Sequence, residues 1–297
     1  MADNEKISKR QGANVILFLP EHWGEVDKFS RFWSTTYSFD MHSQKKISGV
    51  IGHLSKVNYL TSLARRLSPN LAEDERQLHE NGHSPAHNAK ELAAVIETIF
   101  CELYSVLDCA RGVLYSIFPN HKGIRQSTRG TFQNAFADEI DDEIPGSICE
   151  ALKQTESWFH KLRKLRDEVT HQSVGSCTRN RETDKISYLH TGLGGPGKSL
   201  VIENVFSEIE CYFKDINNFL SSVFRELNDT LKDKPVRLLC VVSDGRFFMR
   251  KVCPSEAKDF DSGFCESQKF FDAEGGIECP YKHTCQAYAR AKSEMGS

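Results

Sequence analysis

The chain has 297 residues, of which 39% are hydrophobic and 27% are charged, and its formal net charge is −3. This length suffices for one large domain or two smaller ones, and the charge excludes a global basic field, so any nucleic-acid contact must come from a local basic patch. No apolar run approaches the length of a membrane span, and the polar first residues lack a signal-peptide core, which predicts a cytoplasmic protein without a membrane partner.

Residues 1–85 are predicted to form an N-terminal helical extension. The apolar run Val15–Leu19 indicates a short strand, and apolar residues at helical spacing predict helices over Gly24–Tyr37 and Lys46–Leu67. The polar segment Glu73–His87 follows, and we expect a solvated loop there because a glycine and a proline interrupt it.

Three histidines in that polar segment have the spacing of a metal site. His79, His83 and His87 recur at intervals of four, which on an unbroken helix would place three imidazoles on one face. Because the segment is interrupted, we favour a loop that binds no metal.

Residues 86–233 are predicted to form a helical bundle. Wide apolar stripes predict three long helices, over Asn88–Phe118, Ile148–His171 and Asn204–Leu231. The acidic stretch Phe132–Ile144 is predicted to add a short helix between the first two.

The basic, glycine-bearing segment 120–131 precedes that short helix. Lys122, Arg125 and Arg129 are the residues in it that we expect to contact an RNA phosphate backbone, since lysine and arginine dominate such contacts. A solvated loop without a ligand is the alternative for this segment.

The stretch Trp158–His171 carries the residues with the clearest chemistry. Its apolar residues lie at Trp158, Leu162, Leu165 and Val169, and the other side of the helix is charged. Arginine can grip a phosphate through two hydrogen bonds, and histidine moves protons near neutral pH. The charged side carries Arg163, Arg166, Asp167 and His171.

The run from Arg166 to His171 resembles the R-x4–6-H signature of the HEPN superfamily, in which the residue after the arginine is usually Asn, Asp or His, as Asp167 is here. That resemblance covers roughly residues 86 to 233. It implies a mainly α fold, a HEPN-like helical bundle here carrying an inserted β-hairpin. It also implies a metal-independent endoribonuclease of a defence or toxin system, which acts as a homodimer on RNA.

The same resemblance implies roles for the residues of this helix. His171 would be the general base or acid, and Arg166 would stabilise the charge of the phosphorane. Asp167 would orient His171 or tune its pKa, while Arg163 and Thr170 would contact RNA.

The positions of Arg166 and His171 on one helix bear on how such a site is assembled. Residues five apart differ by about 140° around a helix axis, so the two side chains converge poorly within one chain. Two copies related by a two-fold axis would bring both pairs to one cleft. The alternatives are an exposed charged helix face and a non-catalytic HEPN-like dimer that binds a nucleotide or a regulatory partner protein.

The segment Gly192–Ser199 reads GLGGPGKS and matches the P-loop pattern of nucleotide-binding enzymes. In a P-loop, Lys198 and the serine after it would open a helix, whereas Leu200–Ile202 reads as a strand. Because the strand-like run Lys185–Thr191 precedes the glycines, we predict a β-hairpin inserted in the bundle. A P-loop enzyme stays as a less favoured alternative.

Residues 234–297 are predicted to form a small, cysteine-rich module. Val236–Val242 and Arg246–Val252 read as two strands joined at an Asp-Gly turn, which is typical of a β-hairpin. Few apolar residues follow, so we expect the module to draw stability from a metal.

Four cysteines near the C-terminus are the predicted ligands of that metal. Cys253, Cys265, Cys279 and Cys285 could complete one tetrahedral, structural Zn²⁺ site, although no C-x2-C pair is present. An iron–sulfur cluster and four unligated thiols are the alternatives. The other six cysteines, Cys240 among them, are scattered through helix and strand patterns and are expected to be free thiols.

Overall fold

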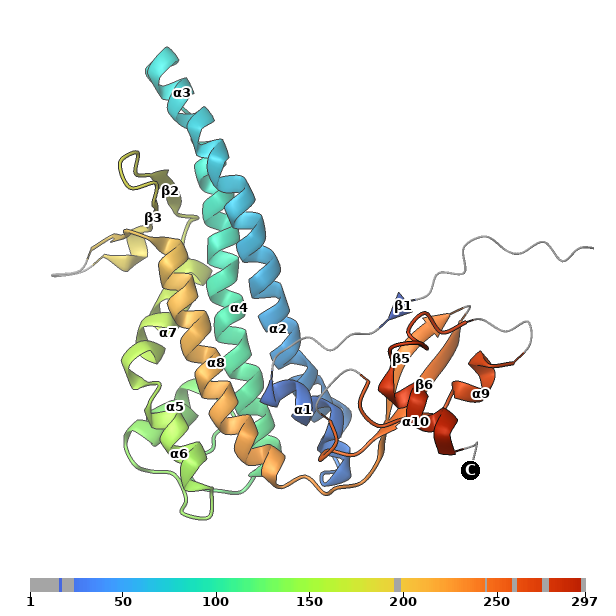
Figure 1. Ribbon diagram of the computed structural model, residues 1–297. Helices are drawn as coiled ribbons and strands as arrows, with labels where there is room; N and C mark the ends of the chain where they lie inside the picture. Colours follow the sequence, from blue (N-terminus) through green and yellow to red (C-terminus); the bar gives the residue numbers. More distant parts are fainter. Residues whose placement is uncertain are drawn as a thin grey trace, which may run out of the picture. The chain divides into compact units, whose positions relative to one another are not determined.

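The computed structural model describes residues 16–17, 24–194, 199–243, 245–257, 261–273 and 278–294. The chain is mainly helical and carries two small antiparallel sheets (Figure 1). Its contacts divide it into two compact units, one of residues 39–227 and the other joining residues 1–38 to residues 228–297. Among the helices in the described ranges, none is both long and apolar enough to cross a membrane.

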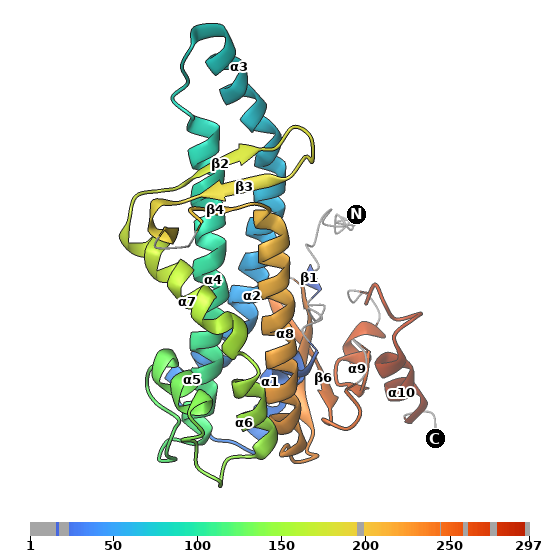
Figure 2. The same cartoon turned by 90° about the vertical axis from the view of Figure 1, so that its left-hand side faces the viewer.

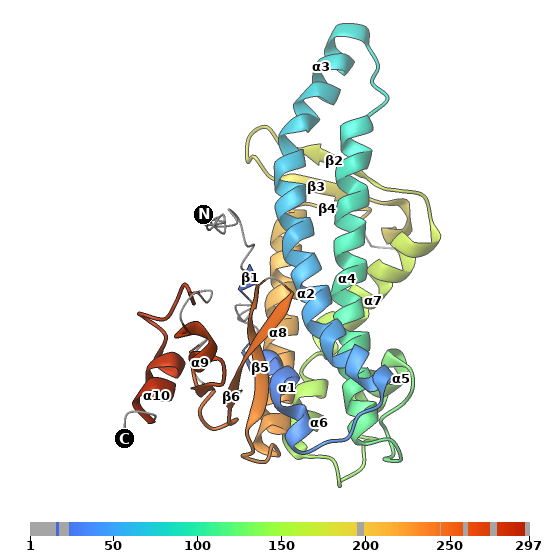
Figure 3. The same cartoon turned by 90° about the vertical axis from the view of Figure 1, so that its right-hand side faces the viewer.

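Three long helices form the frame of the unit 39–227. They are α2 (Met41–Leu67), α4 (His87–Ile117) and α8 (Val205–Asp229), as their apolar periodicity predicts. α2 lies along α4 (Figure 3), and α8 meets α4 where the rings of Phe100 and Tyr212 are 6.3 Å apart. Because α2 needs α4 to cover its apolar stripe, it belongs to this unit rather than to a separate N-terminal extension.

The polar segment after α2 is helical where a loop was expected. α3 (Leu71–Asn81) ends at Gly82, whose φ of 73° is the left-handed conformation that closes a helix. Asp74 is buried and its carboxylate accepts the backbone N–H of Ala89 at 2.8 Å, which ties α3 to the start of α4. The loop prediction was therefore wrong for residues 73–81, because this buried contact outweighs the polar composition.

Three shorter helices lie on the other side of α4, namely α5 (Thr128–Phe136), α6 (Gly146–Lys153) and α7 (Glu156–His171). One continuous helix over 148–171 was predicted, but the helix is interrupted at Gln154–Thr155, between α6 and α7. Thr155 is buried there, and its hydroxyl donates to the carbonyl of Leu152 at 2.7 Å. A separate helix, α7, begins after this interruption. The ring of its Phe159 stacks on the ring of Phe132 in α5, with the ring centroids 4.3 Å apart.

A three-stranded sheet follows α7 (Figure 2). Its strands β2 (Ser176–Arg179), β3 (Ile186–Leu189) and β4 (Val201–Ile202) are antiparallel and lie in that order. The pairing of Tyr188 with Ile202 and of Leu189 with Val201 confirms the hairpin predicted before α8. β2 was not predicted, because its four polar or small residues carry little strand signal.

The unit that joins both ends of the chain holds the second sheet, with strand order β1-β5-β6-β7. β5 (Val236–Ser243) and β6 (Arg246–Val252) confirm the predicted C-terminal hairpin, and β1 (Ile16–Leu17) pairs with β5. β7 is Phe264–Cys265. The helices of this unit are α1 (Glu25–Phe32), α9 (Gln268–Phe271) and α10 (Gln286–Glu294).

These two units divide the chain at other places than the boundaries 85/86 and 233/234 expected from the sequence. The first strand pairs with β5 across more than two hundred residues. Asn228, at the end of α8, donates to the backbone carbonyl of Glu25 at 2.9 Å. Both contacts tie the N-terminal segment to the C-terminal module.

Candidate functional site

The apolar side of α7 packs against α4, and this packing fixes the position of the end of α7. Phe159, Leu162 and Leu165 are buried there, while Trp158 and Val169 are only half-buried. The spacing predicted Trp158 as part of the buried stripe, but Phe159 takes that place. The ring of Phe159 lies 6.2 Å from the ring of Tyr104 on α4.

Arg166 rests on that same aromatic residue. Its guanidinium lies over the Tyr104 ring at 5.0 Å from the centroid, and its Nη1 donates to Asp167 Oδ1 at 2.8 Å. The side chain keeps 36% of its surface exposed. The Tyr104 ring thus covers one face of the guanidinium, and Asp167 binds one of its nitrogens. The rest of the guanidinium is exposed to solvent.

Tyr104 was not recognised from the sequence, although it supports Arg166. Burial, and then the charge of Asp108, raise the pKa of the Tyr104 phenol to about 12. The phenol is therefore neutral near pH 7 and serves as a ring under the guanidinium rather than as a proton acceptor. Its regular spacing with Glu97 and Cys101 on α4 is the signal that could have pointed to it.

Asp167 faces the two arginines of its own helix. Its carboxylate accepts from Arg166 at 2.8 Å and forms an ion pair with Arg163 at 3.6 Å. This differs from the expectation that Asp167 orients His171, because two guanidinium groups compete more strongly for a carboxylate than a neutral imidazole does.

His171 is the last residue of α7 and is exposed. In the described part of the chain its ring has no hydrogen-bond or ion-pair partner. Thr170 is also exposed, but its hydroxyl donates to the carbonyl of Arg166 at 2.6 Å and lies 3.8 Å from the sulfur of Cys101. An imidazole at the open end of a helix can reach a ligand, whereas the Thr170 hydroxyl is already engaged.

Glu97 fixes the chain that leaves this helix end. This carboxylate is buried on α4 and accepts the backbone N–H of Gly175 at 2.7 Å and the hydroxyl of Tyr188 at 2.9 Å. His190 Nε2 donates to the carbonyl of Ser173 at 3.0 Å, while its Nδ1 accepts from the N–H of Gly192 at 3.1 Å. The turn after His171 is thereby fastened to α4 and to the sheet.

The glycine-rich segment begins against the last turn of α7. A Cβ on Gly192 would lie 2.5 Å from the carboxylate of Glu168 and 2.8 Å from the amide of Gln172, so a larger residue there would displace the ends of these two side chains. Lys198 lies outside the described residues, and Ser199 leads into β4 rather than into a helix. The order of elements is therefore that of a hairpin and differs from that of a P-loop.

The expected RNA-contacting residues of the basic segment lie away from this site. Lys122 and Arg125 are in the turn before α5 and Arg129 is in its first turn, all exposed. Gln126 in the same turn bonds to Tyr115 on α4, whereas Thr170 faces Cys101. These two places are roughly 20 Å apart along α4, because a helix rises about 1.5 Å per residue. The structure therefore does not bring the basic residues to His171.

The predicted metal ligands are only partly brought together. Cys265, Cys279 and Cys285 gather in the core of the C-terminal module, but Cys253 lies beside acidic residues after β6 and does not join them. The structure therefore separates Cys253 from the other three predicted ligands. His79, His83 and His87 lie on α3, in the following loop and at the start of α4, and do not share one helix face.

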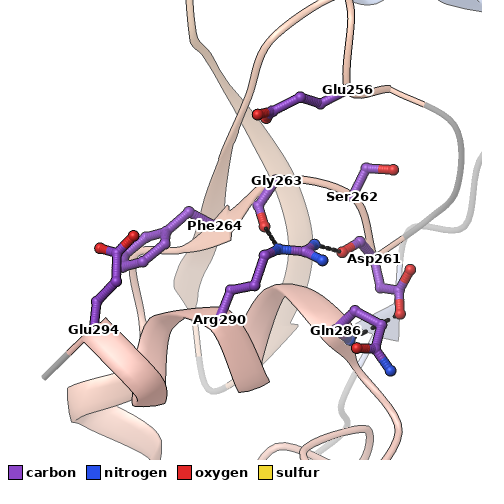
Figure 4. A pocket seen from close by; sticks show the side chains of 8 residues that line it. All are labelled: Glu256, Asp261, Ser262, Gly263, Phe264, Gln286, Arg290 and Glu294. Atoms are coloured by element: carbon purple, nitrogen blue, oxygen red, sulfur yellow. Dashed lines mark hydrogen bonds between the residues drawn. The ribbon is translucent and has the colours of Figure 1, made fainter. Parts of the chain in front are cut away.

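A separate open cavity of about 460 Å³ lies in the C-terminal module (Figure 4). Arg290 reaches across it and donates to the carbonyls of Gly263 and Asp261, each at 2.7 Å. Glu256 and Glu294 also line it. The guanidinium of Arg290 is already bound to backbone carbonyls, and the carboxylates of Glu256 and Glu294 would repel an anion. The described lining of this cavity is therefore unsuited to phosphate.

Comparison with known proteins found no relative. No protein-family model matches the chain, and neither a curated protein nor a solved structure matches it. The function therefore has to be argued from the residues at the end of α7.

Proposed function

We propose that this protein is a metal-independent endoribonuclease, of the kind found in defence and toxin systems, with Arg166 and His171 in its active site. The observation that carries the proposal is the end of α7. There a guanidinium is held over Tyr104 and an imidazole stands exposed on a turn that Glu97 fastens to α4. A fixed cation and an accessible proton carrier are the two groups that RNA transesterification requires.

In the proposed reaction, a ribose 2′-hydroxyl attacks the adjacent phosphorus. A His171 imidazole takes the proton of that hydroxyl as the new O2′–P bond forms, and the P–O5′ bond breaks as a second imidazole gives its proton to the leaving oxygen. Arg166 stabilises the negative charge of the phosphorane. The products are a 2′,3′-cyclic phosphate and a 5′-hydroxyl, and the nucleobase takes no part.

A second copy of the chain would supply the second imidazole and bring the two arginines together. Arg166 points to Tyr104, whereas His171 ends the helix and is exposed, which agrees with their separation of about 140° around the axis. Three exposed apolar side chains near this helix end support an interface there. Their exposed fractions are 50% for Val174, 41% for Leu189 and 43% for Leu200.

The test is cleavage of single-stranded RNA by purified protein in EDTA. We expect cleavage of RNA but not of DNA, and a single 2′-deoxy substitution at the cut site should block cleavage there. His171→Ala should lower the rate roughly 10²–10⁴-fold, which is the range for a positioned proton-transfer group. Arg166→Ala should cost a comparable factor by removing charge stabilisation.

His160→Ala is the matched control, because His160 lies on the same helix and is exposed, but packs beside Phe136 away from the helix end. It should leave the rate close to that of the wild type. A panel of RNAs cut equally by the wild type and by the Arg166→Ala, His171→Ala double variant would refute the assignment. RNA or nucleotide binding without any cleavage would favour the non-catalytic dimer.

A further inference from the structure

Four cysteines surround one cavity in the C-terminal module. Cys240 comes from β5, Cys265 from β7, and Cys279 and Cys285 from the turn that leads into α10. All four line the same cavity, and each of the four thiols is close enough to the other three for an electrostatic interaction between them. The thiols are thus distributed around a common centre.

Cys240 is the member of this group that the sequence does not reveal. It lies in a strand, far from the other three in the chain, whereas Cys253 is nearer to them in sequence but is placed beside Asp233 and Glu256. The antiparallel pairing of β5 with β6, and of β6 with β7, brings Cys240 to Cys265. Topology therefore completes a set of four thiols.

Backbone N–H groups lie close to two of these sulfurs. Those of Ser267 and Gln268 are close to Cys265, and those of Tyr281 and Lys282 are close to Cys279. Backbone N–H groups that donate to ligating sulfurs orient them and influence the properties of the bound metal.

The charge and polarity around the cavity also suit thiolate ligands. Arg250 is buried at 4% exposure, lines the cavity and donates to the carbonyl of Ser262 at 2.7 Å. Its positive charge offsets the negative charge that ligating thiolates bring into a buried place. Phe271 and Tyr288 add aromatic rings to the lining of the cavity.

We propose that Cys240, Cys265, Cys279 and Cys285 bind a [4Fe–4S] cluster, a site that does not depend on the nuclease proposal. The cavity that these side chains line has a volume of about 30 Å³.

One observation favours a cluster over a single ion, since four cysteine thiolates can ligate either group. A structural zinc ion would need all four sulfurs at about 2.3 Å from one point. Within the ranges that the structure describes, no three His, Cys, Asp or Glu side chains are grouped to hold one metal ion.

Binding of two ferrous ions, two ferric ions and four sulfides exchanges four S–H bonds for four Fe–S bonds and releases the thiol protons to solvent. The thiol of Cys240 at present donates to the carbonyl of Phe248 at 3.3 Å, and this hydrogen bond is given up when its sulfur binds iron. The cluster then links β5, β7 and the start of α10. It adds stability to a module whose described apolar core is small.

The experiment compares Cys240→Ala with Cys253→Ala in the full chain, purified without oxygen and supplied with equal amounts of ferrous and ferric iron and with sulfide. The wild type should be brown, should bleach on reduction, and should hold about four iron and four sulfide per chain. Cys253→Ala should keep this content, whereas Cys240→Ala should lose most of it.

The opposite ranking of the two variants would overturn the ligand set. Zinc at about one per chain, with no iron or sulfide in the wild type, would overturn the cluster. Should Cys240→Ala fail to fold, the metal and sulfide content of the wild type and of Cys253→Ala decides instead. Absence of iron and sulfide from the wild type refutes the proposal, and their loss from Cys253→Ala refutes the exclusion of Cys253.

Discussion

Arg166 is held by contacts with two neighbouring side chains, Asp167 and Tyr104. Burial alone would lower the pKa of Arg166, but the hydrogen bond to Asp167 and the negative charges around the guanidinium together outweigh burial, and the pKa is raised. The guanidinium therefore stays charged at every pH at which the protein is folded. Tyr104 supports it from below with an uncharged ring.

Tyr104 gives a prediction on stability at high pH. Burial raises its pKa to about 12, from about 10 in the unfolded chain. Folding therefore favours the protonated phenol, a contribution that is complete below about pH 10 and is lost as the pH rises through about 12. Tyr104→Phe keeps the ring under Arg166 and removes this ionisation.

We therefore expect the unfolding free energy of Tyr104→Phe to fall less than that of the wild type between about pH 10 and pH 12. Urea titration at several pH values measures this. Tyr59→Phe is the control, since Tyr59 is 71% exposed. A pH dependence of Tyr104→Phe identical to that of the wild type would contradict the buried, neutral phenol.

At the scale of elements, α4 is the support on which α7 and the first sheet are assembled. Glu97 joins the turn after α7 to β3, because one carboxylate oxygen accepts from both Gly175 and Tyr188. The two hydrogen bonds offset the cost of burying the Glu97 carboxylate. If the carboxylate is removed, the N–H of Gly175 and the hydroxyl of Tyr188 lose their acceptor, which lowers the free energy of unfolding.

The second prediction is that Glu97→Ala lowers the unfolding free energy by about 3–5 kcal/mol, since two hydrogen bonds to a charged group are lost. Tyr188→Phe should cost about 1–3 kcal/mol, because only one of them is lost. Glu91→Ala, an exposed change on the same helix, should have almost no effect. Urea unfolding compares all three, and a Glu97→Ala variant as stable as Glu91→Ala would contradict the anchoring role.

The glycine-rich segment is the third subject of prediction. Because Ser199 leads into β4, we expect Lys198→Ala to leave the fold and any RNA cleavage nearly unchanged. Circular dichroism and the cleavage assay check this. Magnesium-dependent binding of ATP by the wild type, abolished by Lys198→Ala, would show that the segment is a P-loop after all.

At the scale of the whole molecule, the proposed site requires two chains. We expect a homodimer in light scattering at micromolar concentration, formed through the surfaces around the end of α7. Leu189→Glu should favour the monomer and reduce cleavage, because the exposed side chain would then place a charge in an apolar interface. Leu78→Glu is the control, since Leu78 is 53% exposed on α3. A strictly monomeric wild type that still cleaves RNA would refute the shared site.

Local patterns determined most of the helices and the C-terminal hairpin. The apolar stripes of α4 and α8 are periodic over many turns, and the Asp-Gly turn marks the joint between β5 and β6. Such signals need only residues that are neighbours in the chain. They failed at α3 and at the break before α7, where one buried contact in each case overrides the composition.

The sequence by itself also singled out Arg166 and His171, because an arginine and a histidine at that spacing form a recognisable local motif. Only the tertiary structure placed Tyr104 under Arg166, joined Glu97 to Tyr188 across 91 residues, and put Cys240 rather than Cys253 beside the other three cysteines. The physical reason is the range of the interactions. Helical periodicity depends on neighbours three and four residues away, whereas these contacts depend on the path of the whole chain between them.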